Sequence, residues 1–140
     1  MSNAIYPLYM QELLKGTADT ALNGAEGATS GVFCALVDTG AYTYSAAHQY
    51  YSSVAAAAVG TAQEILTKTQ TNGTFDGSDL VFPTVSGNSV EALVLFRKNG
   101  GADTTWPLIA YIDNGVTGLP VTPNGGNISV TWNASGIVKF

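Results

Sequence analysis

The chain of 140 residues is long enough for one domain with an ordinary hydrophobic core. Hydrophobic residues make up 46% of it and charged residues only 11%, so its polar surface consists mainly of uncharged side chains. The net charge of -5 argues against nucleic acid as a partner, because phosphate binding needs clustered cations. A surface poor in ions can be buried against a neighbour at little desolvation cost, which favours a subunit of an assembly.

The sequence shows no sign of a membrane span or a secretory signal. No apolar run approaches the roughly 18 residues of a membrane helix. The N-terminus lacks the basic region and the long apolar stretch of a signal peptide. We therefore expect a soluble protein made in the cytoplasm, in which the single Cys34 is a buried, inert thiol that forms no disulfide within the chain.

The first half of the chain predicts two short helices separated by a loop and a strand. Pro7 suits the first turn of a helix and Gly16 suits its end, so residues 1–16 are expected to form an N-terminal arm with one helix. Residues 17–31 are small, polar and rich in glycine, which is typical of a flexible loop. Residues 46–59 are rich in alanine and predict a second short helix.

The remaining segments predict an antiparallel β structure. Residues 32–37 are apolar on both faces, as in a buried central strand. Beyond Gly60, short runs of β-forming residues alternate with turn pairs such as Asn72-Gly73. The predicted fold class is mainly β with a minor α+β character. Residues 32–140 are expected to form an antiparallel β-sandwich, of which a jelly roll is one form, decorated by the two helices.

One motif points to catalysis. An apolar strand that enters Asp38-Thr39-Gly40 is typical of aspartic proteases, in which two such aspartates share one proton. The chain lacks an apolar-apolar-glycine segment near its C-terminus to brace that loop, and Asp-Thr-Gly is also ordinary turn chemistry. A retroviral-type aspartic protease that uses Asp38 is therefore kept as the alternative from another class.

Other chemical sites fail on residue type or spacing. One histidine, His48, and one cysteine cannot build a conventional zinc site in a single chain. Asp76 and Asp79 lack a further acidic ligand at the spacing of a calcium loop. Trp106 and Trp132 suggest a carbohydrate-binding module, but Trp132 lies in the core-facing phase of its strand. We predict no catalytic residue, no metal and no cofactor.

Protein contacts are the function that these features favour. Tyrosine offers a large contact area with a polar tip, and a loop with two prolines loses little conformational entropy on docking. The expected contact elements are the N-terminal helix, the tyrosine-rich stretch after residue 40, the glycine-rich segment 17–31 and the loop of residues 116–126. The candidate interface residues are Tyr6, Leu8, Tyr9, Tyr42, Tyr44, Tyr50, Leu119, Pro120 and Pro123.

A series of segments covers most of the chain in a characteristic order. They are residues 3–16, 35–45 with His48, 72–77, 90–94, 110–113, 117–126, 128–132 and 136–137. The most distinctive is Thr-Gly-Leu-Pro-Val-Thr-Pro-Asn-Gly-Gly at 117–126. The series resembles a family of small virion structural proteins of tailed bacteriophages and prophages, of the decoration or minor structural type. The insert at 17–31 departs from the family pattern, so no contacts are carried over to it.

The resemblance implies a virion part without catalytic residues. The expected function is that of a capsid decoration or cement protein, which binds the major capsid protein, stabilises the shell and self-associates. A structural protein of the head–tail junction, the tail or a fibre is the alternative within the virion.

Overall fold

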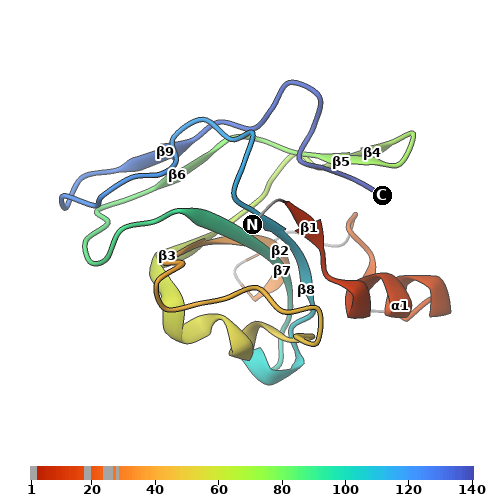
Figure 1. The fold of residues 1–140 in the computed structure, drawn as a ribbon. Coiled ribbons are helices and arrows are strands. Elements are labelled where there is room, and N and C mark those ends of the chain that lie inside the picture. Colours follow the sequence, from red (N-terminus) through yellow and green to blue (C-terminus); the bar gives the residue numbers. More distant parts are fainter. Residues whose placement is uncertain (1–2, 18–19, 24–26, 28) are drawn as a thin grey trace.

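The computed structural model describes residues 3–17, 20–23, 27 and 29–140 (Figure 1). They form a mainly β structure in which antiparallel sheets pack together, with one α-helix near the N-terminus and several short 3-10 turns. The predicted fold class is confirmed. Within the described residues, no helix is both long enough and apolar enough to cross a membrane.

The larger layer is a fully antiparallel sheet of five strands in the order β1-β8-β7-β2-β3. Strand β2 is buried along almost its whole length, as expected for residues 32–37, because other parts of the chain cover both faces of the sheet. The strands are β1 (Ala4–Ile5), β2 (Ser30–Val37), β3 (Ala58–Glu64), β7 (Ala92–Asn99) and β8 (Leu108–Ile112).

Two smaller antiparallel sheets lie side by side above the five-stranded sheet (Figure 1). One has the order β10-β5-β4 and the other pairs β6 with β9. In β6, Leu80 and Phe82 are buried while Val81 between them is 53% exposed, the period of two that directs one face into the core. The strands are β4 (Thr69–Thr71), β5 (Thr74–Asp76), β6 (Leu80–Phe82), β9 (Ile128–Val130) and β10 (Val138–Lys139). A jelly roll has eight strands in two sheets. This protein has one large sheet that faces two small ones, so its sandwich is not a jelly roll.

The helix expected at residues 46–59 is replaced by two single 3-10 turns, η2 (Tyr51–Ser53) and η3 (Ala55–Ala57), and by the start of β3 at Ala58. Backbone groups in this segment bond to distant segments: Tyr51 N–H donates to the Trp106 carbonyl oxygen at 2.9 Å, and the Ala57 carbonyl oxygen accepts from Asp38 N–H at 3.0 Å. These tertiary bonds replace the helical ones, so the expected extent is wrong although a short helical element is present. A further turn, η4 (Asp103–Thr105), lies between β7 and β8.

The N-terminal helix α1 (Pro7–Lys15) begins at the proline and ends at Gly16, as predicted. Gly16 has a φ of 75°, and its N–H donates to the Leu13 carbonyl oxygen, which is the left-handed stop that glycine tolerates best. The flexible loop expected at 17–31 lies partly outside the described residues, at 18–19, 24–26 and 28. Its last residues, from Ser30 onward, belong to β2.

Candidate functional site

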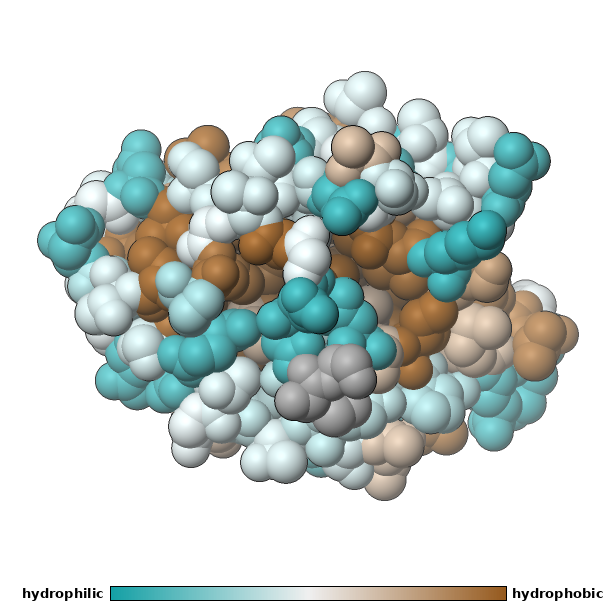
Figure 2. Space-filling view, turned by 45° about the horizontal axis from the view of Figure 1, so that its top comes forward, coloured by the Kyte–Doolittle hydropathy of each residue, from teal (hydrophilic) through white to brown (hydrophobic). Residues whose placement is uncertain are grey.

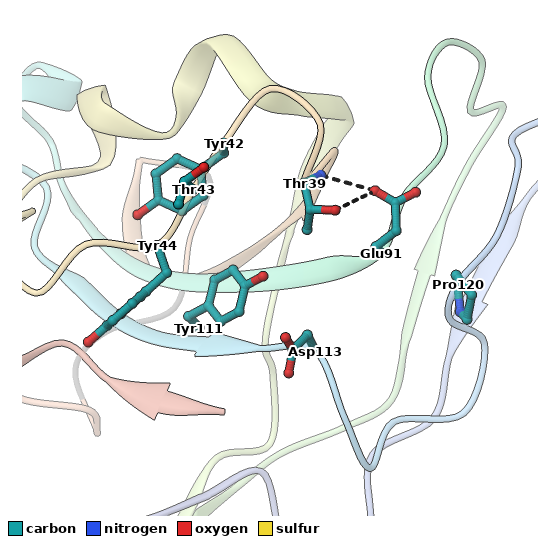
Figure 3. A pocket seen from close by; sticks show the side chains of 8 residues that line it. All are labelled: Thr39, Tyr42, Thr43, Tyr44, Glu91, Tyr111, Asp113 and Pro120. Carbon is teal, nitrogen blue, oxygen red and sulfur yellow. Dashed lines mark hydrogen bonds between the residues drawn. The ribbon is translucent and has the colours of Figure 1, made fainter. Parts of the chain in front are cut away.

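A pocket of about 450 Å³ lies at one end of the five-stranded sheet (Figure 3). The chain registers bring the end of β2, the start of β7 and the end of β8 to this place, since Val37 pairs with Ala92 and Leu93 pairs with Ile112. The loop of residues 116–126 closes one side. The lining residues are Thr39, Tyr42, Thr43, Tyr44, Glu91, Tyr111, Asp113 and Pro120.

Asp38 turns the chain at the end of β2 and thereby places the tyrosines over the sheet. Its Oδ1 atom accepts a hydrogen bond from Gly40 N–H at 2.8 Å, and its Oδ2 atom accepts one from the Asn88 side chain at 3.0 Å. Its carbonyl oxygen accepts a hydrogen bond from Tyr42 N–H at 3.1 Å. This is the turn role that the sequence allows for Asp-Thr-Gly. The protease alternative stays a prediction that the geometry does not require.

Tyrosines form the floor of the pocket. The Tyr42 hydroxyl shares hydrogen bonds with the Tyr6 hydroxyl at 2.8 Å and with His48 Nδ1 at 2.9 Å. The Tyr44 ring lies with its centroid 5.1 Å from that of Tyr6 and 5.6 Å from that of Tyr111. Burial raises the pKa of Tyr6, Tyr42 and Tyr111, so these phenols stay neutral. The floor is therefore an uncharged surface of packed aromatic rings.

Carboxylates form the rim. Glu91 Oε1 accepts hydrogen bonds from the N–H and the hydroxyl of Thr39 at 3.0 and 2.9 Å. Hydrogen bonds from Ser89 first, and then from Thr39, lower the pKa of Glu91. After burial, the nearby charge of Asp113, then Tyr42 and then the charge of Glu91 contribute to the raised pKa of Tyr111. In Figure 3 the Tyr111 hydroxyl points away from the other tyrosines.

Backbone hydrogen bonds hold the loop of residues 116–126 beside the pocket at three places. Leu119 is half-buried against the core, Pro120 is exposed and Pro123 is half-buried. The backbone of the loop is ordered in the isolated protein, as its hydrogen bonds show. The backbone hydrogen bonds pair Thr117 with Thr131 at 3.1 Å in both directions, Val121 with Val90 at 2.9 and 2.8 Å, and Gly125 and Gly126 with Val85 at 2.8 and 2.9 Å.

The structure sorts most of the predicted interface residues into two places. Tyr42, Tyr44 and Pro120 come together in the pocket of Figure 3. A smaller hollow of about 180 Å³, between α1 and the segment that leads into η2, is lined by a second group. From the predicted set, that group contains Leu8, Tyr9 and Tyr50.

Three of the predicted interface tyrosines lie inside the protein. Tyr6, Tyr9 and Tyr42 are only 0%, 2% and 5% exposed. Such side chains support the shape of a surface and have almost no area to offer a partner. The interface prediction therefore depends on the exposed and half-buried members of the set, above all Tyr44 and Pro120, and it stays a prediction.

Sequence reasoning missed Tyr111, Glu91 and Asp113. A usable signal was present, because Glu91 directly precedes β7 and Asp113 directly follows β8. When neighbouring strands are antiparallel, the start of one and the end of the other share an edge. Two acidic residues flanking apolar strands in this way were therefore candidates for one site.

Other candidate residues serve the fold. The Trp132 indole N–H donates to the Ser78 carbonyl oxygen at 2.9 Å, and Asp79 accepts a hydrogen bond from Trp132 N–H at 2.9 Å. Cys34 is buried as expected, and burial raises the pKa of its thiol. In the part of the chain that the structure describes, no three histidine, cysteine or acidic side chains gather where a metal ion would bind.

Fold and pocket together define a mainly β protein with a tyrosine-lined, acid-rimmed pocket beside an ordered, uncharged loop. No protein-family model matches the chain, and no curated protein matches it in sequence.

Proposed function

We propose that the protein is a non-enzymatic structural subunit of a tailed-phage virion, where it binds the shell of major capsid protein as a decoration or cement protein. The observation that carries the proposal is the 116–126 loop, which is both uncharged and ordered. Residues 114–138 contain no charged side chain at all. Docking of this surface costs no desolvation of ions.

The order of the loop is the second part of the argument. Association is opposed by the entropy lost when interface segments become fixed. Because hydrogen bonds to Thr131, Val90 and Val85 already hold the loop, little of that cost remains at the moment of binding. A loop with these properties suits a protein that must bind many equivalent places on a shell.

Other parts of the surface are also suited to protein contact. Figure 2 shows apolar side chains in a hollowed band on one face, bordered by hydrophilic and near-neutral residues. Two further hollows, of about 380 and 330 Å³, share lining residues that include Ile112, Ile137 and Val138. Both hollows mix apolar side chains with polar ones, as protein interfaces do.

The mechanism is stabilisation by linkage. A protein that binds the assembled shell, and not its dissociated subunits, shifts the equilibrium toward the shell by mass action. Each copy adds buried area between neighbouring capsid subunits, so the effect grows with the number of copies bound.

The direct test adds purified protein to undecorated capsids and measures the temperature at which they disassemble. The wild-type protein is expected to raise that temperature, and Thr122→Arg in the exposed loop is expected to weaken binding. Thr104→Arg is the matched control, because η4 lies at the opposite end of the β7–β8 hairpin from the loop. Unchanged disassembly with saturating wild-type protein would refute the decoration role.

A second measurement locates the protein in the particle. Band intensities from purified virions give its copy number relative to the major capsid protein. Comparable numbers support the shell, whereas a small fraction moves the protein to the head–tail junction, the tail or a fibre. Its absence from virions would end the phage assignment.

A further inference from the structure

The pocket of Figure 3 has the lining of a cation site. Its walls are the tyrosine floor, Pro120, two threonines and the carboxylates of Glu91 and Asp113. None of its eight lining residues is lysine, arginine or histidine. The geometry points to a pocket that receives a cationic side chain, an arginine or lysine presented by the partner protein. The inference deepens the proposed function, since it states what the partner must offer.

The carboxylates supply the charge. Glu91 is held in place by two hydrogen bonds from Thr39, so its orientation is set before a ligand enters. A carboxylate has about four acceptor sites, which leaves Glu91 able to receive a further N–H donor. Asp113 is half-buried on the same side of the pocket, where a neighbouring charge is less screened than in open water.

The aromatic rings supply the second attraction. Tyr44 is half-buried and stands between Tyr6 and Tyr111, which fix the angle of its ring. A cation over an aromatic face is attracted by the ring quadrupole, and a guanidinium also stacks there through its plane. Arginine suits both parts of the lining, because one of its N–H groups can donate to a carboxylate while its plane lies on a ring.

Other ligand classes fit less well. A saccharide needs an exposed aromatic platform, but Tyr42 and Tyr111 are 5% and 3% exposed. An anion would be repelled by Glu91 and Asp113. A divalent metal ion would need a tighter group of ligands than the described residues provide here.

The test is an NMR titration of the full chain with the N-acetyl methylamide of arginine, with that of lysine, and with that of citrulline, the neutral counterpart of arginine. Saturable shifts at Thr43, Tyr44 and Glu91 with both cations, and none with citrulline at the same concentration, are expected. Equal binding of citrulline would overturn the inference, as would maltose shifting these signals when the arginine compound does not.

Variants localise the effect. Glu91→Gln and Asp113→Asn are each expected to weaken binding of the arginine compound by about tenfold, the loss of one charge-assisted contact. Asp103→Asn in η4 removes the same charge far from the pocket and should leave binding unchanged. If Glu91→Gln fails to fold, Tyr44→Leu tests the aromatic wall independently. Equal loss in Asp103→Asn would show a general charge effect and overturn the inference.

The outcome is separable from that of the capsid experiment. If the arginine and lysine compounds fail to bind while capsids are still stabilised, the cation pocket is refuted and the decoration role stands. If both compounds bind and capsids are not stabilised, the pocket stands and the proposed partner is wrong.

Discussion

Glu91 connects the turn after β2 to the beginning of β7. Its carboxylate accepts hydrogen bonds from two groups of Thr39, and a hydrogen bond from Ser89, followed by those from Thr39, lowers its pKa. The same contacts therefore order the chain at the pocket and keep the rim negatively charged near neutral pH. One side chain serves both the fold and the binding chemistry that we infer.

The lowered pKa of Glu91 makes the stability of the protein depend on pH. A carboxyl group whose pKa is lower in the folded chain stabilises it above the unfolded pKa of about 4.3, and this contribution is lost as pH falls through the folded pKa. Glu91→Gln is expected to lower the free energy of unfolding at neutral pH by about 1 kcal/mol or less, because water screens the half-exposed group. Urea unfolding of the wild type and the variant, from neutral to acid pH, measures this difference in the free energy of unfolding.

Ser89→Ala is the companion variant, because Ser89 provides the largest contribution to the low pKa. It should remove part of the same acid dependence while leaving the Glu91 charge in place. If wild type and Glu91→Gln lose stability in parallel as the pH falls, the hydrogen bonds around Glu91 do not have the assigned role.

The 116–126 loop shows how an irregular segment becomes a defined surface element. The segments that follow β6 and β9 and the segment before β7 hold it by backbone hydrogen bonds, and Leu119 packs against the core. Two glycines, one in the loop and one beside it, differ in the space that a Cβ atom would have. At Gly118, with a φ of 114°, a Cβ atom would collide with the Ser129 carbonyl oxygen, whereas at Gly115, with a φ of 79°, it would meet no atom within 4 Å.

This pair separates the two costs of replacing glycine. Gly115→Ala adds only left-handed strain and is expected to cost about 1 kcal/mol of stability. Gly118→Ala adds a clash with backbone as well and should cost more than about 2 kcal/mol. Thermal unfolding of both variants checks the order. Equal melting temperatures would mean that the loop is not held against β9 as described.

At the scale of the whole molecule, one hydrophobic core draws on both ends of the chain, and buried tyrosines are a conspicuous part of it. Desolvation raises the pKa of each of them, to about 12 for Tyr51. The other four are Tyr6, Tyr9, Tyr42 and Tyr111. A phenol of this kind cannot ionise in place, so the core resists deprotonation until it opens.

The protein is therefore expected to unfold at alkaline pH. The folded pKa values lie above the unfolded value of about 10, so the tyrosine contribution is complete below that pH and is lost as the pH rises through the folded values. Phenolate absorbance of the buried tyrosines should rise in the same step in which circular dichroism shows the sheets unfolding. Early ionisation of these rings with the sheets intact would contradict their burial.

The sequence signals that succeeded are local ones. Pro7 and Gly16 mark the ends of α1, and the apolar run at residues 32–37 marks the buried strand β2. The alanine-rich segment failed as a long helix because its backbone groups, such as those of Tyr51 and Ala57, bond to distant residues. Local propensity is weak compared with tertiary hydrogen bonds of this kind.

By itself the sequence determined the mainly β class, the helix ends and the scarcity of charge, because these follow from backbone stereochemistry, the period of two and composition. Only the tertiary structure decided that Tyr6 and Tyr42 are buried while Tyr44 lines a pocket, and that Glu91 and Asp113 share its rim. Those facts depend on how distant strands pair and pack, which no local pattern specifies.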